Sequence, residues 1–111
     1  MAESRKRNKP YYPLQKVKEK IAQGQYLIKP NAVYSAFQDF GWNEADIKQV
    51  YRKLQDNHYQ KTDKSKTIPG IMLDVYYVEN INGEDVYTHF YIDDDRLIIN
   101  SFHQLSILEK E

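Results

Sequence analysis

The chain has 111 residues, of which 41% are hydrophobic, so it can build one small domain with a modest core and is not wholly disordered. It contains no cysteine, which excludes a disulfide scaffold and a cysteine-ligated zinc site. No apolar run approaches the roughly 18 residues of a membrane helix, and the polar, basic start shows no secretory signal, so we expect a cytoplasmic protein that does not contact membranes.

Positive and negative charges are divided unevenly along the chain, although they sum to a net charge of zero. Residues 1–70 hold 14 basic and 7 acidic residues, whereas residues 71–111 hold 2 basic and 9 acidic residues. Such a division is typical of a polyanion-binding face, and equally of a solvated basic tail with ordinary helix surfaces. We expect a basic flexible arm over residues 1–10, one domain over residues 11–103 and a C-terminal tail over residues 104–111.

Apolar residues recur at helical spacing in the first half and predict helices over residues 13–23, 31–40 and 44–57. Gly24 and Gly41 are suitable stop residues for the first two helices, and Asn43 with Asp46 resembles a capping box for the third. The predicted core-facing residues are Leu14, Val17 and Ile21 in the first helix, Val33, Ala36, Phe37 and Phe40 in the second, and Ile47, Val50, Tyr51 and Leu54 in the third.

After residue 57 the pattern changes to a period of two and predicts strands over residues 58–62, 71–79, 85–92 and 96–103. Residues 63–70 read as a loop, Asn82-Gly83 as a hairpin turn and residues 93–95 as a second turn. Helices followed by strands are typical of an α+β fold, with N-terminal helices packed on one face of a C-terminal antiparallel β-sheet.

Alternation within the strands predicts which side chains meet the helices. In the strand over residues 85–92, the apolar set that should meet the helices is Val86, Thr88, Phe90 and Ile92. The opposite set is too polar for a core and too aromatic for an ordinary surface, and consists of Asp85, Tyr87, His89 and Tyr91. In the last strand, the same alternation groups His103 with Leu97 and Ile99, and Phe102 with Asn100.

The polar sheet face favours metal-free cleavage of RNA as one hypothesis. RNA carries its own nucleophile, the 2′-hydroxyl, so cleavage needs a general base, a general acid and a cation for the phosphorane. Lys61, Tyr87 and His103 offer these three functions from separate strands, and exposed tyrosine rings can stack on bases. Each residue also has a structural interpretation, because cross-strand tyrosines, surface histidines and solvated lysines are common.

Metal chemistry has weaker support in the sequence. The three histidines show no ligand spacing, and the acidic run at residues 93–95 lacks the pattern of a calcium loop, so we expect no metal and no cofactor. A metal-dependent nuclease built on Asp74 and the acidic run stays open as an alternative.

Several short segments, in order between residues 14 and 103, together resemble one protein family. They are LQKVK at residues 14–18, AQGQ at 22–25, YQKT at 59–62, MLDVY at 72–76, GEDVYTHF at 83–90 and SFH at 101–103. The chain thereby resembles the MqsR (motility quorum-sensing regulator) family of bacterial mRNA-interferase toxins, which are related to RelE-type toxins. The family's active site uses a Lys, a Gln, a Tyr and a Lys on these segments. Lys61 and Tyr87 match it, whereas Leu73 replaces the Gln and His103 replaces the second Lys.

The resemblance implies a toxin of a type II toxin–antitoxin system, an endoribonuclease that cleaves mRNA and is neutralised by a cognate antitoxin with a helix-turn-helix DNA-binding part. Together with the residue pattern it gives Lys61, Tyr87 and His103 as catalytic residues, and as substrate-binding residues His89, Tyr91, Lys64 and Lys66. The alternative is a non-catalytic nucleic-acid- or protein-binding module on the same scaffold, which Leu73 and the acidic residues 71–111 favour.

Overall fold

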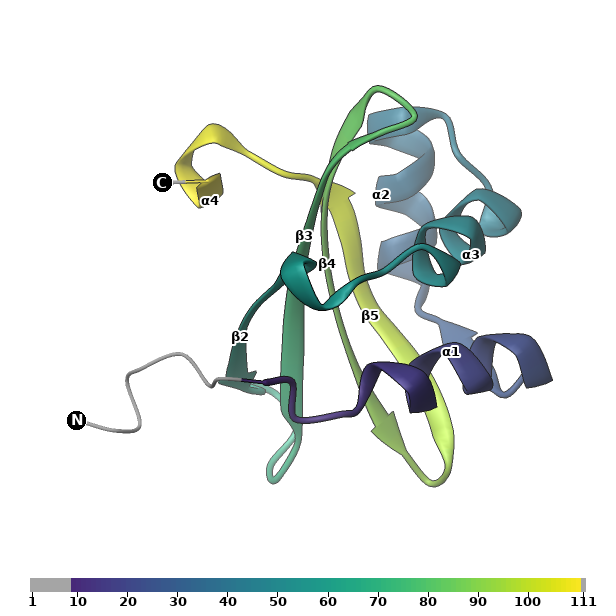
Figure 1. The fold of residues 1–111 in the computed structure, drawn as a ribbon, viewed down its shortest axis with the longest axis vertical. Helices are drawn as coiled ribbons and strands as arrows, with labels where there is room; N and C mark the ends of the chain where they lie inside the picture. Colours follow the sequence, from purple (N-terminus) through teal and green to yellow (C-terminus); the bar gives the residue numbers. More distant parts are fainter. Residues whose placement is uncertain (1–8, 111) are drawn as a thin grey trace.

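The structure is a computed structural model that describes residues 9–110; residues 1–8 of the predicted basic arm and Glu111 lie outside the described residues. The helices are α1 (Leu14–Gln23), α2 (Pro30–Phe40), α3 (Glu44–Arg52), the 3₁₀ turn η2 (Asp56–His58) and α4 (Ile107–Lys110). The strands are β1 (Tyr26–Ile28), β2 (Tyr59–Lys64), β3 (Met72–Ile81), β4 (Glu84–Asp93) and β5 (Arg96–Gln104). The predicted α+β fold is confirmed (Figure 1).

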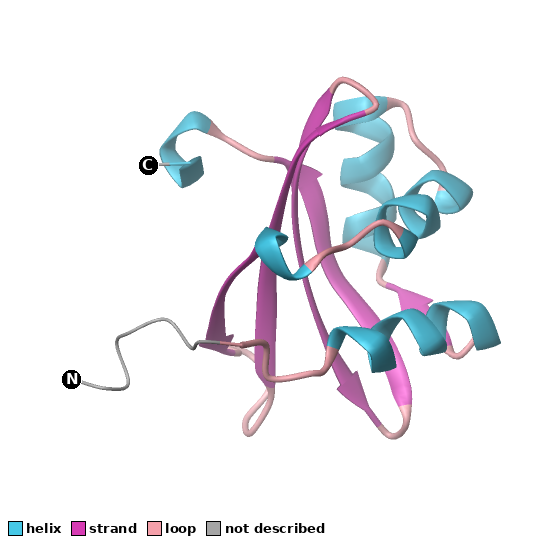
Figure 2. Cartoon of the chain, in the orientation of Figure 1, coloured by secondary structure: helices cyan, strands magenta, loops and turns pink. Residues whose placement is uncertain are grey.

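The sheet is mixed rather than purely antiparallel, with strand order β1-β5-β4-β3-β2. The four predicted strands are β2 to β5, antiparallel neighbours whose ends lie within two residues of the prediction. The sequence prediction lacks β1, which pairs in parallel with β5 (Figure 2). Its three residues between Gly24 and Pro30 are too few to show an alternating pattern.

Helices α1, α2 and α3 pack against one side of the sheet, here called the covered face, which carries Val86, Thr88 and Phe90 of β4 (Figure 1). The core faces predicted for the first and third helices are confirmed, since Val17, Ile21, Ile47, Val50, Tyr51 and Leu54 are at most 2% exposed. The capping box of α3 is present. No helix in residues 9–110 is long and apolar enough to cross a membrane.

Two helix predictions need correction. Of the residues predicted to face the core from α2, Ala36 is buried and Phe40 packs against the core. Val33 and Phe37 are instead exposed, and Ala32 is buried in addition. Two alanines four residues apart let the helix backbone lie close to β5, and they leave the larger side chains on the outer side. Helix α3 ends at Arg52 instead of residue 57. The prediction is too long because Leu54 is buried although it lies beyond the helix, so the helical spacing of apolar residues continues past the helix end.

The faces predicted for β5 are also wrong in its second half. Leu97, Ile99 and Phe102 lie in one core cluster, although strict alternation assigns Phe102 to the other face. The pairing of β4 with β5 shifts between His89 and Phe90, so one additional residue of β5 is accommodated there. A β-bulge of this kind reverses the alternation beyond it. As a result, His103 lies on the face opposite the helices.

Candidate active site

The face of the sheet opposite the helices, here called the open face, carries Tyr87, His89 and His103. Tyr87 of β4 and His103 of β5 are direct cross-strand partners, so their side chains share a face. Their rings stack with centroids 4.5 Å apart and planes 11° from parallel. Helix α4 lies on the same side of the sheet, away from α1, α2 and α3 (Figure 1). The two candidate proton-transfer groups are therefore adjacent and outside the core.

The imidazole of His103 is half-buried, and one of its nitrogens contacts the backbone. Its Nδ1 lies 2.8 Å from the carbonyl oxygen of Gln104. Because a carbonyl oxygen only accepts hydrogen bonds, Nδ1 carries the proton of the neutral ring. The lone pair of Nε2 is then available to take a proton from a substrate.

The phenol of Tyr87 is held in its protonated form. Burial raises its pKa to about 12, and the negative charges of Glu109 and Asp63 act in the same direction. Its hydroxyl oxygen lies 3.0 Å from Nδ1 of His89, two residues along the same strand. At neutral pH Tyr87 is therefore a hydrogen-bond or proton donor rather than a base.

Lys61 reaches the open face from the edge strand β2. It pairs with Val75 of β3, which in turn pairs with His89 of β4, so all three share a face. Two strand spacings separate Lys61 from His89, about 10 Å between backbones, and a lysine side chain spans much of that. Its side chain is 48% exposed and its Nζ lies 3.5 Å from Oδ2 of Asp63. The three predicted catalytic residues thus lie on one face, with Lys61 at its edge.

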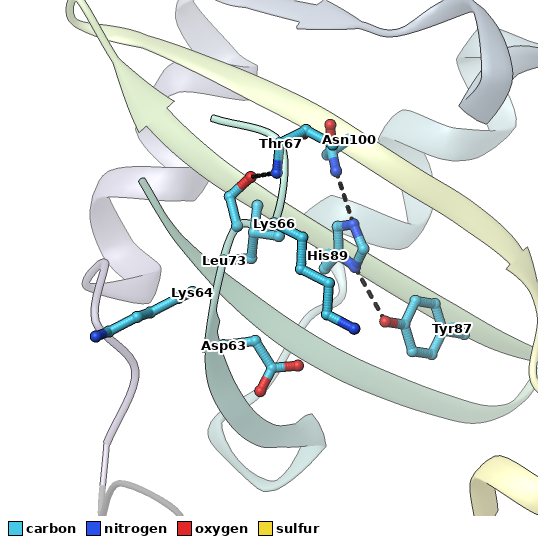
Figure 3. A pocket seen from close by; sticks show the side chains of 9 residues that line it. Asp63, Lys64, Lys66, Thr67, Leu73, Tyr87, His89 and Asn100 are labelled. Carbon is cyan, nitrogen blue, oxygen red and sulfur yellow. Dashed lines mark hydrogen bonds between the residues drawn. The ribbon is translucent and has the colours of Figure 1, made fainter. Parts of the chain in front are cut away.

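A cavity of about 570 Å³ lies on the open face beside Tyr87 (Figure 3). Its walls come from β2 to β5 and from the loop that joins β2 to β3. The lining residues are Asp63, Lys64, Ser65, Lys66, Thr67, Leu73, Tyr87, His89 and Asn100. In Figure 3 the side chain of Lys66 extends toward Tyr87 and His89, whereas that of Lys64 points away from them. Of the two predicted RNA-binding lysines, Lys66 is the one directed at the site.

Tyr91 does not line the cavity, although it lies on the open face. Its side chain is 6% exposed and packs against Leu73 and Ile98 in a second, smaller apolar cluster. The ammonium group of Lys29 lies 5.6 Å from the centre of its ring. In this conformation a base could stack on Tyr91 only after that cluster opened.

Sequence reasoning missed Asn100, Asp63 and Lys29 as neighbours of the site. Asn100 donates its side-chain amide toward Nε2 of His89 at 2.8 Å, and it lies in β5 where the register shifts. The one sequence feature that points to the position of Asn100 is the spacing of apolar residues in β5. Leu97, Ile99 and Phe102 can all face the core only if the strand contains a bulge.

Two acidic residues of the metal-dependent alternative, Asp74 and Asp95, bind other groups of the protein. The fully buried carboxylate of Asp74 accepts hydrogen bonds from the backbone N–H groups of Tyr11 and Tyr12 and from the hydroxyl of Thr62. Asp95 pairs with Lys20 at 2.6 Å. Within residues 9–110, no three His, Cys, Asp or Glu side chains are grouped closely enough to hold a metal ion.

The sequence model of one family, described as "Motility quorum-sensing regulator, toxin of MqsA", matches residues 9–104. The chain belongs to this family. Membership makes it the toxin of a toxin–antitoxin pair, with an antitoxin as its partner. No curated protein matches the chain.

Proposed function

We propose that this MqsR-family toxin is an endoribonuclease that cleaves mRNA without a metal ion. The observation that carries the proposal is the stacked pair of Tyr87 and His103 beside the open-face cavity. Lys61 and Lys66 supply positive charge on the same face, where a scissile phosphate would lie. This arrangement contains a base, an acid and cations, the groups that RNA cleavage by its own 2′-hydroxyl requires.

His103 acts as the general base in this mechanism. Its Nε2 takes the proton of the 2′-hydroxyl while the 2′-oxygen attacks the adjacent phosphorus. A pentacoordinate phosphorane forms with one additional negative charge on its oxygens. Because Nδ1 is held by the Gln104 carbonyl, the reactive lone pair is on the nitrogen that faces away from the backbone.

Tyr87 acts as the general acid. The bond between phosphorus and the 5′-oxygen breaks, and the 5′-oxygen takes the proton of the Tyr87 hydroxyl, which leaves a 2′,3′-cyclic phosphate and a 5′-hydroxyl. A pKa raised to about 12 keeps that proton on Tyr87 until the leaving oxygen becomes basic enough to take it. The ammonium groups of Lys61 and Lys66 stabilise the charge on the phosphorane.

The two predicted lysines near the cavity would contact the RNA beyond the scissile bond. Lys66 and Lys64 lie in or next to the loop between β2 and β3 and would bind backbone phosphates. His89 and Tyr91 are part of the same face, although neither is fully accessible. The cognate antitoxin would carry a helix-turn-helix part, and a neighbouring gene encoding such a protein would support this assignment.

RNA cleavage by the purified full chain tests the proposal. In the presence of EDTA, we expect an mRNA transcript to be cut to products with 2′,3′-cyclic phosphate ends. Lys61→Ala, Tyr87→Phe and His103→Ala should each lower the cleavage rate by about 10²- to 10⁴-fold, the usual contribution of acid–base groups. Lys53→Ala and His58→Ala are matched controls and should cleave normally, because Lys53 is the C-cap residue of helix α3 and His58 lies in η2 near Lys18 of helix α1, not among the open-face groups. Intact RNA, or equal cleavage by all variants, would contradict the mechanism.

A non-catalytic binding module is the second candidate, and Leu73 favours it. This side chain lines the cavity at the position where the family has a glutamine, and it can neither donate nor accept a hydrogen bond. A binding module would retain the RNA or a protein partner without cutting RNA. Cells that express the chain at a high level and keep both normal growth and intact mRNA would support this candidate.

A further inference from the structure

His89 lies at the centre of a hydrogen-bonded chain on the open face. Its Nδ1 is 3.0 Å from the hydroxyl oxygen of Tyr87, and its Nε2 is 2.8 Å from the side-chain nitrogen of Asn100 (Figure 3). Both distances are within hydrogen-bonding range. Both ring nitrogens are therefore occupied by protein groups, so His89 has none left to offer to RNA.

The direction of these hydrogen bonds follows from the donor at one end. An amide nitrogen only donates, so Nε2 of His89 accepts from Asn100, and the proton of the neutral ring is on Nδ1. Nδ1–H then donates to the hydroxyl oxygen of Tyr87. Because that oxygen accepts a hydrogen bond from His89, the hydroxyl proton of Tyr87 does not point toward His89. Since Tyr87 lines the cavity, this proton is free to point into it.

The surroundings of His89 keep its ring neutral, as this arrangement requires. Burial and the nearby His103 lower its pKa to about 4, and Lys29 acts in the same direction while Asp63 opposes it. Lys66 also extends toward this part of the site (Figure 3). A neutral imidazole has one donor and one acceptor nitrogen, which matches its two partners.

The backbone of β5 places Asn100 for this contact. His89 pairs with Ser101 and Phe90 pairs with Ile99, so Asn100 is the additional residue of the bulge. A bulged residue is released from strict alternation and can direct its side chain toward a neighbouring group. The same bulge brings His103 to the face of Tyr87.

We propose that His89 is a positioning residue that acts through Tyr87, with Asn100 fixing its tautomer. This inference rests on the proposed function and assigns His89 a task other than RNA binding. Nδ1–H directs the Tyr87 proton toward the leaving oxygen. When that proton moves to the 5′-oxygen, the bond from Nδ1–H stabilises the phenolate that remains. The proton taken up by His103 later returns to Tyr87 through solvent, so each turnover restores the starting state.

A double-mutant cycle measures whether His89 acts through Tyr87. His89→Leu should lower kcat by about 10- to 100-fold, the value of a hydrogen bond to a charged partner, with little change in KM. In a Tyr87→Phe background the same substitution should have no further effect. Asn100→Leu should cause a smaller loss of kcat than His89→Leu, and His58→Leu serves as the control. Equal losses with and without Tyr87, or a loss confined to KM, would overturn the inference.

The tautomer of His89 can be measured without any activity. Nitrogen-15 NMR of the labelled full chain should show a protonated Nδ1 and an unprotonated Nε2 at pH 7, with this preference reduced in Asn100→Leu. A protonated Nε2 would overturn the inference even if RNA is cleaved. Conversely, a chain with the expected tautomer that leaves RNA intact would overturn the proposed function while the hydrogen-bond assignment stands.

Discussion

The two faces of β4 carry polar groups that are used in different ways. On the covered face, the hydroxyls of Thr88 and Tyr51 are 2.6 Å apart and fully buried. On the open face, Tyr87 and His89 also contact each other, but they line a surface cavity. Pairing on the covered face satisfies polar groups and stabilises the fold. Under the mechanism proposed above, pairing on the open face instead orients the proton of Tyr87 toward the substrate.

The largest expected effect is on the covered face. Phe90 is fully buried and its ring contacts those of Tyr51 and Tyr76. Phe90→Ala should lower the free energy of unfolding by about 3–5 kcal/mol, because it removes apolar contacts and leaves a cavity. The open-face substitution Tyr87→Phe should change it by less than about 1 kcal/mol. Urea denaturation of both variants measures the difference, and equal destabilisation would remove the distinction between the two faces.

Thr88 tests the covered face at a polar position. Its hydroxyl donates to the carbonyl of Ser101 at 2.7 Å, so it accepts from Tyr51. Thr88→Val should cost about 1–3 kcal/mol of stability, because the buried Tyr51 hydroxyl loses its partner. Adding Tyr51→Phe should recover part of that loss in thermal or urea unfolding. If the double variant is less stable than Thr88→Val, the loss in Thr88→Val does not come from an unpaired Tyr51 hydroxyl.

The covered face also shows which parts of the fold the sequence predicts and which it does not. Alternation in a regular strand is a local property, so it predicts Val86, Thr88 and Phe90 on the helix side, and all three are buried there. The capping box of α3 is equally local. The orientation of α2 depends on how closely its two alanines approach β5, which is a property of the packed protein and not of helical spacing.

The open face was harder to predict because it depends on a single irregularity. Tyr87 and His89 follow the regular alternation of β4, but regular alternation in β5 would have grouped His103 with the buried Leu97 and Ile99. The bulge moves His103 to the open face, but no glycine or proline in this part of β5 indicates a bulge in the sequence. The hydrogen bonds made by Asn100 follow from the same bulge and were missed for the same reason.

The pH dependence of stability should separate the faces further. The pKa of His89 is lowered from 6.5 to about 4, so between these values the unfolded chain binds a proton that the folded chain does not. Stability should therefore fall as pH drops from 6.5 toward 4. After reduction for partial solvent access, the loss should be about 1–2 kcal/mol. Urea unfolding at pH 6.5 and at pH 4 measures this loss in the parent chain and in His89→Leu. The variant should lose less stability between the two pH values, because it lacks the contribution of His89. A variant as pH-sensitive as the parent would assign the titration to another group, such as His58, whose pKa burial also lowers.

The smallest expected effect comes from restoring an amide to the open face. Leu73 is 8% exposed, lines the cavity and packs against Tyr91 and Ile98. Because the family resemblance implies a glutamine at this position, Leu73→Gln should raise kcat/KM for RNA by up to about tenfold, as expected for one additional neutral hydrogen bond. Leu73→Met, which is similar in volume but forms no such bond, should leave cleavage unchanged. If Leu73→Gln folds and binds RNA but does not cleave it faster, an amide at this position is not needed on the open face of this toxin. The hydrogen-bonded chain of Asn100, His89 and Tyr87 would then take the place of that amide.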